Sequence, residues 1–253
     1  MKKKLSTEEI LKLKSTDNKL SMVTAYDFVS GYIVNNSKAD MILVGDSYGT
    51  TSLGYKLTNQ VEITDIIRAT KSISNNRINT LLISDLPYKT YETKSQALEN
   101  AKKLIDCGAD AVKLEGGVEK KEIITFLVDN NIKVMGHIGI KPQNITKFEQ
   151  YKILGKNKNE YKGIMEDAIT VEKSGVFALV LELIQSELSH EITKKLNIPT
   201  IGIGSGEFTD GQVQVFNDLI GYSPFKLPKH AKKYSDVFKI ATESINNFIR
   251  EVK

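Results

Sequence analysis

Five short apolar runs in this chain each end on an ionisable side chain. Runs of about four to six residues rich in Val, Ile and Leu are typical of buried β-strands, which rarely carry charge. Where such strands run parallel, their carboxyl ends meet on one face, and ligands bind on that face. The sequence therefore predicts a mouth that collects four carboxylates and an imidazole, from Asp46 (MILVGD), Asp85 (LLISD), Glu115 (AVKLE), His137 (IKVMGH) and Glu182 (ALVLE).

Like charges placed this close together cannot all stay ionised unless a cation joins them or protons are taken up. Asp46, Asp85 and Glu115 end three consecutive predicted strands, so we expect them to be neighbours around the mouth. Carboxylate oxygens suit a hard cation such as Mg²⁺, with water or substrate completing the coordination shell. A single acid at a strand end is more often a solvated turn residue, but the repetition favours a metal-assisted active site.

Two further residues allow two interpretations each. Lys113 lies two positions before Glu115, so the alternation of side chains along a strand puts both on one face. If that face is the interior, Lys113 either holds an anionic substrate or forms a structural ion pair with Glu115. His137 is either a hydrogen-bonded packing residue or part of the site. His190 and His230 fall in helical or loop contexts and are interpreted as structural.

A glycine-rich turn, Gly202–Gly206, follows the seventh predicted strand. It resembles the phosphate-binding loop of β/α barrels. Glycines also serve simply to let a chain turn tightly. The turn is therefore weak evidence for phosphate binding. The sequence also carries no nucleotide-binding glycine fingerprint, no HExxH motif and no CxxC motif.

Strand-like and helix-like stretches alternate through the chain, and they predict one (β/α)8 TIM barrel domain over residues 1–253. Its length is close to the roughly 250 residues typical of this fold, and the count of units favours it over an open sheet. A leading helix from residue 6 to 14 and a C-terminal amphipathic helix from 235 to about 252 flank the barrel. The long segment 138–159 is predicted to be a lid or substrate loop. We expect strands at 22–26, 41–46, 81–87, 111–115, 132–137, 177–182 and 199–204, then a short helix from about 211 and a weak eighth strand at 219–223.

Composition excludes several other classes of protein. The net charge of +4 is mild, the lysines are scattered and arginine is rare, which argues against nucleic-acid binding. No run of about 18 apolar residues predicts a membrane span. The single cysteine, Cys107, excludes an internal disulfide framework, fits a reducing, cytoplasmic location and is interpreted as a packing residue.

A set of short motifs covers about residues 20 to 230. They are TAYD (24–27), LVGDSYG (43–49), DLPY (85–88), VKLEGG (112–117), GHIGIKPQ (136–143), LVLE (179–182), IPTIGIGSG (198–206) and DGQ (210–212). In this order they resemble the ketopantoate hydroxymethyltransferase (3-methyl-2-oxobutanoate hydroxymethyltransferase) family. The resemblance implies a barrel of the phosphoenolpyruvate mutase/isocitrate lyase type and the first committed step of pantothenate synthesis.

The resemblance also implies ligands and roles for particular residues. Family members use Mg²⁺ and take a one-carbon unit from 5,10-methylenetetrahydrofolate, which they transfer to the keto acid 3-methyl-2-oxobutanoate. They form homo-oligomers, so a decamer built as a pentamer of dimers is expected, with the C-terminal helix as a candidate dimer contact. By position, Glu182 matches the proton acceptor, Asp46, Asp85 and Glu115 match the metal site, and Asp46, Ser47, Asp85, Lys113 and His137 are assigned to substrate binding.

Two stretches depart from the family pattern. Residues 149–155 lack the usual glycines and carry Leu154 where a Gln is expected, and residues 226–230 end in His230 where a Phe is expected. Both could contact the folate. A second hypothesis is a carbon–carbon lyase or mutase on the same scaffold, which would need a reactive cysteine or phosphate-binding arginines. A third is a diverged, non-enzymatic binding protein, against which the intact acids argue.

Overall fold

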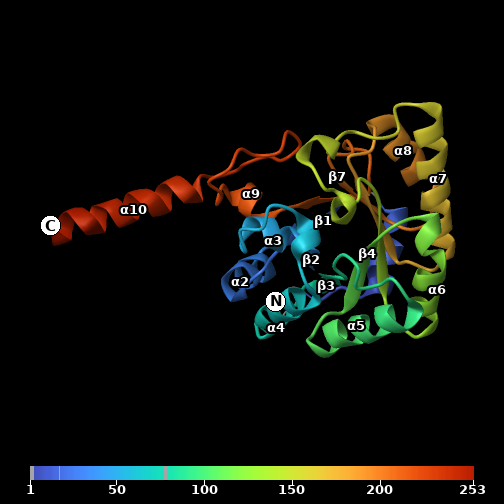
Figure 1. Cartoon of the computed structure of the whole chain (residues 1–253), viewed down its shortest axis with the longest axis horizontal. Coiled ribbons are helices and arrows are strands. Elements are labelled where there is room, and N and C mark those ends of the chain that lie inside the picture. The colour runs from blue at the N-terminus through green and yellow to red at the C-terminus, as the bar shows by residue number, and fades with distance from the viewer. Residues whose placement is uncertain (1–2, 17, 77–78) are drawn as a thin grey trace.

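Eight parallel strands form a closed barrel in which neighbours in the chain are neighbours in space and β1 pairs with β8. The computed structural model describes residues 3–16, 18–76 and 79–253, so residues 1–2, 17 and 77–78 of the predicted domain lie outside the described residues. Helices surround the barrel (Figure 1), which confirms the predicted (β/α)8 architecture. The strands are β1 (Leu20–Thr24), β2 (Met41–Val44), β3 (Leu81–Asp85), β4 (Ala111–Glu115), β5 (Val134–Gly139), β6 (Ala178–Glu182), β7 (Thr200–Ile203) and β8 (Gly211–Gln214).

The helices follow the strands along the chain. The α-helices are α1 (Thr7–Lys12), α2 (Phe28–Asn36), α3 (Ser47–Thr51), α4 (Ile63–Ser74), α5 (Lys94–Asp106), α6 (Lys121–Asp129), α7 (Lys158–Lys173), α8 (Ser186–Lys195), α9 (Phe216–Ile220) and α10 (Val237–Val252). Short 3₁₀ helices are η1 (Leu13–Ser15), η2 (Thr58–Gln60), η3 (Val118–Lys120), η4 (Pro142–Asn144) and η5 (Phe148–Gln150).

Strands β2 to β6 are buried on both faces along almost their whole length, which is why they read as continuous apolar runs. Alternate residues point to opposite sides, so one apolar cluster fills the barrel and another packs between strands and helices. Ile10 of α1 belongs to the interior cluster and closes the N-terminal end of the barrel. A capping box starts α1, because Ser6 and Glu9 each accept a hydrogen bond from the other's backbone N–H.

The predicted eighth strand at 219–223 is wrong. The eighth strand is β8, at Gly211–Gln214, where a helix was expected, and Leu219 lies in α9. β8 escapes detection because Val213 is its one strongly apolar residue and faces the interior cluster between two glutamines. Gly221 takes a left-handed conformation, with φ of 66°, and ends α9 as a C-terminal glycine does.

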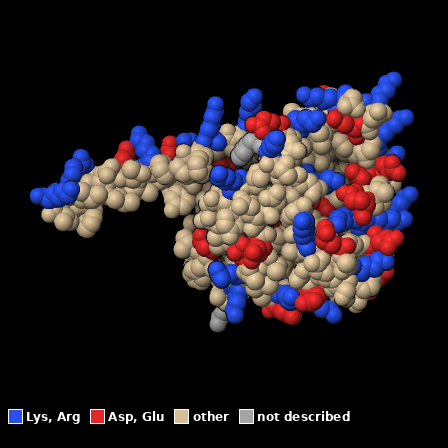
Figure 2. All heavy atoms as spheres, viewed as in Figure 1, with Lys and Arg blue, Asp and Glu red and all other residues tan. Residues whose placement is uncertain are grey.

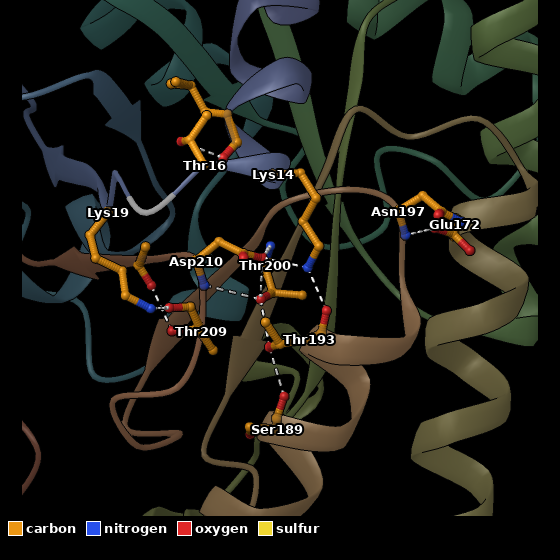
Figure 3. Close-up of polar contacts among 12 residues, drawn as sticks. Lys14, Thr16, Lys19, Glu172, Ser189, Thr193, Asn197, Thr200, Thr209 and Asp210 are labelled. Carbon is orange, nitrogen blue, oxygen red and sulfur yellow. Dashed lines mark hydrogen bonds and ion pairs between the residues drawn. The ribbon is translucent and has the colours of Figure 1, made fainter.

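A polar network at the N-terminal end of the barrel holds β7, β8 and the leading segment together (Figure 3). Asp210 Oδ2 accepts hydrogen bonds from Thr200 N at 2.8 Å and Thr200 Oγ1 at 3.0 Å. The same oxygen pairs with Lys14 Nζ at 2.8 Å, and Lys14 also donates to Thr193 O of α8. Directed polar contacts therefore support a strand that is too short to be held by apolar packing alone.

The helix layer is incomplete on one side. Residues 204–210, all described, run from β7 to β8 without forming a helix, and α10 then extends away from the barrel (Figure 1). Within α10, described throughout, no residue is buried, and charged side chains lie along one side with uncharged ones along the other (Figure 2). Neither α10 nor any other helix of the described residues has the length and apolar character needed to span a membrane.

Candidate active site

Strand register brings the predicted site residues together at the C-terminal mouth. Asp85 of β3 lies beside Lys113 of β4, and Glu115 of β4 lies beside His137 of β5. Alternation along the strands turns these side chains inward, above the apolar interior. All are buried although polar or charged, with Asp46 6%, Asp85 1%, Lys113 4%, Glu115 3% and His137 2% exposed.

Lys113 forms an ion pair with Asp85, and not the alternative pair with Glu115. Its Nζ lies 2.7 Å from Asp85 Oδ1, while Asp85 Oδ2 accepts the backbone N–H of Asp46 at 2.9 Å. Burial works against the charged form, but the charges of Asp85, Asp46 and Glu115 raise the pKa of Lys113 above its usual value. Lys113 is therefore a buried ammonium.

Asp46 and Glu115 lack a full set of partners. Burial, followed by the Asp85 charge, raises the pKa of Asp46 to about 7. Burial and the Asp46 charge raise the pKa of Glu115 well above its usual value. Among the described residues, Asp46 Oδ2 and Glu115 Oε1 are buried without a hydrogen-bond partner. Such oxygens call for either a proton or a cation.

His137 lies between the two halves of the site. Its Nδ1 is 3.4 Å from Lys113 Nζ and 3.5 Å from Glu115 Oε1. Its Nε2 is 3.2 Å from Glu182 Oε2, a contact with the distance but not the geometry of a hydrogen bond. Burial and the Lys113 charge lower the pKa of His137 well below its usual value, so the ring is neutral.

Glu182, at the end of β6, differs from the other acids. Its side chain is 14% exposed, so it reaches the open part of the mouth. Burial raises the pKa of Glu182 to about 7, against the opposing charges of Lys113 and His230. A carboxylate with a pKa near neutrality can gain and lose a proton in turn, as a general base must.

Ser47 begins α3, directly after Asp46. Its Oγ lies 2.7 Å from the hydroxyl of Tyr26. Tyr26 is 2% exposed, and burial raises the pKa of its hydroxyl, so it remains a neutral phenol. The Ser47 hydroxyl is thus held at the mouth beside the acids.

Sequence reasoning missed three residues near this site. Gln143 and Tyr91 are buried and hydrogen-bonded to each other, and each also forms a hydrogen bond to Glu115. His230 lies against Gly204, where an added Cβ would be 3.1 Å from the His230 Cγ, and its charge acts on Glu182. Signals existed for His230, in its departure from the family pattern, and for Gln143, which is the last residue of the GHIGIKPQ motif.

The predicted loop 138–159 is docked against the barrel in this structure. Leu154 N donates to Leu183 O at 2.8 Å, and Gln185 N donates to Leu154 O at 2.9 Å. Beside it lies a cavity of about 260 Å³ lined in part by Gly139, Leu154 and Asp167. The Leu that replaces the expected Gln therefore belongs to the docking contact and to the wall of a cavity.

The glycine-rich turn after β7 has a structural use. Ser205 Oγ donates to Leu181 O at 2.8 Å and accepts from Ile184 N at 3.0 Å. An added Cβ at Gly206 would be 2.2 Å from Ser186 Oγ. These contacts support its interpretation as a tight turn.

The geometry of the acids fits a metal site that is completed by water and substrate. Within the described ranges, no three His, Cys, Asp or Glu groups already converge as the ligands of a metal ion. Mg²⁺ commonly binds through one or two carboxylates and takes its other ligands from water and substrate. The buried, unpartnered Asp46 Oδ2 and Glu115 Oε1 fit that kind of site.

Solved structures with the same arrangement define the fold class. One is 2,3-dimethylmalate lyase, a member of the PEP mutase/isocitrate lyase superfamily, with a TM-score of 0.60, 13% identity and coverage of 82% of this chain and 80% of that one. Another is phosphonopyruvate hydrolase in complex with oxalate and Mg²⁺, with a TM-score of 0.65, 7% identity and coverage of 98% and 87%. At these identities the likeness concerns the fold, a (β/α)8 barrel of the superfamily type.

Sequence comparison narrows this class to one family. The ketopantoate hydroxymethyltransferase family model matches residues 4–253. The 3-methyl-2-oxobutanoate hydroxymethyltransferase of Thermoanaerobacter pseudethanolicus is 43% identical over 255 residues, which is 100% of this chain and 93% of the relative. The enzyme of the same name from Thermotoga maritima is 40% identical over 250 residues, or 98% and 92%. The chain belongs to the ketopantoate hydroxymethyltransferase family.

Replacing Lys113 with Met is expected to lower the free energy of unfolding by about 3–5 kcal/mol, because the Asp85 carboxylate would be left buried without its ammonium. Urea denaturation measures this change at about pH 8, which is well above the ordinary pKa of a carboxyl side chain. Lys133→Met is the control, since Lys133 pairs with Glu8 at the surface and should contribute less than about 1 kcal/mol. A Lys113→Met protein as stable as the wild type would contradict the buried ion pair.

Proposed function

We propose that this chain converts 3-methyl-2-oxobutanoate, 5,10-methylenetetrahydrofolate and water to 2-dehydropantoate (ketopantoate) and tetrahydrofolate, in the cytoplasm. Its family and its named relatives support this reaction. The observation that carries the proposal is Glu182, a carboxylate at the mouth whose pKa is raised to about 7 by burial. It lies beside a buried ammonium and three further acids, a set suited to an α-keto acid whose C3 proton must be removed.

The keto acid is proposed to bind to Asp46, Ser47, Asp85, Lys113 and His137. Lys113 supplies positive charge for the substrate carboxylate, and the Ser47 hydroxyl supplies a hydrogen bond. Neutral His137 lies 3.4 Å from Lys113 Nζ and 3.2 Å from Glu182 Oε2, so it spans the distance between the Lys113 ammonium and the base.

Mg²⁺ is proposed to be held by Asp46 and Asp85, with Glu115 close by or linked through water. When bound, it would draw electron density from the keto oxygen and make the C3 proton more acidic. The free oxygens of Asp46 and Glu115 support a cation here, as does the Mg²⁺ in the phosphonopyruvate hydrolase complex, which has the same fold.

Glu182 then takes the C3 proton as general base. The electron pair left on C3 forms a bond to the methylene carbon of the folate. Both bonds from that carbon to the two folate nitrogens break, water supplies the hydroxyl group of the product, and the two nitrogens take up one proton from C3 and one from water. The folate is proposed to approach past residues 149–155 and 226–230, the stretches that depart from the family pattern.

A lyase or mutase reaction has less support. Cys107 is the C-cap of α5, and barrel helices run opposite to the strands, so it lies toward the N-terminal end of the barrel. It is therefore remote from the mouth where a reactive thiol would be needed.

Glu182→Gln keeps the shape of the side chain and removes the base. The variant should bind keto acid and Mg²⁺ but lose exchange of the C3 proton with deuterated solvent by about 100-fold or more. NMR measures this exchange without folate, and Glu187→Gln, an exposed change in α8, is the control. In the wild type the rate should rise with pH and level off above about 7, since the ionised carboxylate is the active form. Exchange at the wild-type rate in Glu182→Gln would assign the base to another group, with His137 next.

Asp85→Asn should leave the barrel folded but weaken Mg²⁺ binding and lower product formation by roughly 10-fold or more, because a neutral amide is a poor ligand for a hard cation. Titration calorimetry gives the Mg²⁺ affinity, and a chelator should abolish wild-type activity until Mg²⁺ is restored. The control is Asp106→Asn, an exposed position at the end of α5. Unchanged Mg²⁺ dependence in Asp85→Asn would reject the metal assignment.

The active form is proposed to be a homo-oligomer, a decamer arranged as a pentamer of dimers, with α10 packing on a second copy. The apolar side of α10 is exposed, including Phe238, Ile245 and Phe248 at 43%, 60% and 64%. On α2, Val29 and Tyr32 are 64% and 55% exposed. α2 lies on the side of the barrel from which α10 extends (Figure 1), so each copy offers both an apolar helix and an apolar surface.

Changing both Ile245 and Phe248 to Asp should reduce the oligomer to smaller species, because the charges would have to be buried against the partner. Light scattering at micromolar protein gives the mass. Lys239→Ala, on the same helix but exposed and charged, should leave the mass unchanged. A wild type that is a stable monomer would contradict the assembly, and a double variant with wild-type mass would remove α10 from the contact.

A further inference from the structure

Gln143 lies at the point where three strand ends meet. It belongs to η4, in the segment that follows β5, and it is 1% exposed. Its backbone N–H donates to Glu115 Oε2 at 3.1 Å, and its side-chain Nε2 donates to Leu86 O, just past β3, at 3.0 Å. A buried polar side chain with this many contacts contributes specific geometry rather than apolar packing.

Tyr91 fixes which way the Gln143 amide points. Leu86 O can only accept a hydrogen bond, so the amide nitrogen must face it and the amide oxygen must face the other way. That oxygen, Oε1, accepts a hydrogen bond from the Tyr91 hydroxyl at 2.6 Å. The same hydroxyl lies 3.3 Å from the backbone oxygen of Glu115. The amide therefore has one orientation.

The contacts of Gln143 determine which oxygen of the Glu115 carboxylate stays available. On Glu115, Oε2 is occupied by the Gln143 N–H, and among the described residues Oε1 is left buried without a partner. On Asp46, Oδ2 is likewise left buried without a partner. Gln143 thus occupies one side of the Glu115 carboxylate and leaves the other side for a ligand, together with the free oxygen of Asp46.

We infer that Gln143 is a positioning residue of the active site. Its side-chain hydrogen bonds to Leu86 O and Tyr91 fix the place of its backbone N–H, which holds the Glu115 carboxylate so that the free oxygen faces the bound cation and keto acid. This inference rests on the proposed function and adds to it the residue that links the segment after β5 to the acids. Glutamate could not take its place, because it cannot donate to Leu86 O and would add charge beside two acids.

Gln143→Met tests the inference, because Met has a similar shape and makes none of the side-chain hydrogen bonds. The Mg²⁺ affinity of the purified, metal-free protein should fall by about 10- to 100-fold, the usual effect of removing a residue that orients a metal ligand. Titration calorimetry measures it, at a temperature at which a thermal scan shows every variant folded. Asn144→Ala, an exposed change at the next position, should bind Mg²⁺ as the wild type does.

Tyr91→Phe provides a second variant that removes only the orienting hydroxyl. It should weaken Mg²⁺ binding in the same direction by a smaller factor. In the Gln143→Met background it should have no further effect, because the hydroxyl acts through the amide.

A Gln143 that merely supports the fold would lower the thermal midpoint and leave Mg²⁺ affinity unchanged, and that result overturns the inference. If Gln143→Met does not fold, Tyr91→Phe with wild-type affinity overturns it. These outcomes differ from failure of the proposed function. In that case the wild type itself neither binds Mg²⁺ nor exchanges the C3 proton, and both the proposed function and the inference about Gln143 are rejected.

Discussion

Four carboxylates surround a single ammonium at the barrel mouth, and the properties of the site follow from this imbalance of charge. Lys113 is committed to Asp85, which leaves Asp46 and Glu115 to compete for protons or for a cation. His137 cannot supply the missing charge, because the same ammonium and its own burial keep it neutral. Without a bound cation the mouth therefore has more negative than positive charge, and this imbalance, which the fold imposes, favours cation binding.

The positions of the acids could be predicted because they obey a simple pattern. An inward-facing residue at the last position of a buried strand must lie at the mouth, and the alternation along β4 places Lys113 and Glu115 on the same side. Register between neighbouring strands then pairs Asp85 with Lys113 and Glu115 with His137. The sequence offered Glu115 as the ion-pair partner of Lys113, and the choice of Asp85 required the structure, because it depends on the register between β3 and β4.

Other parts of the site and fold carry no such pattern. Gln143 lies in a loop, and its burial depends on how that loop docks over β3 and β4, which periodicity along the chain does not reveal. β8 has one apolar residue facing the core, so its signal is weaker than that of the helix that follows. His230 reaches the mouth because the chain after α9 returns over Gly204, a long-range contact that the departure from the family pattern at this position does not by itself locate.

The pairing of β8 with both β7 and β1 also has a consequence for biogenesis. A ribosome releases β1 through β7 before β8, and a seven-stranded open sheet exposes unpaired backbone along both of its outermost strands. The four residues of β8 remove both edges at once, joining Leu20 to Gly211 on one side and Ile201 to Gly211 on the other. The nascent chain is thus most prone to pair its open strand edges with another chain just before β8 is synthesised.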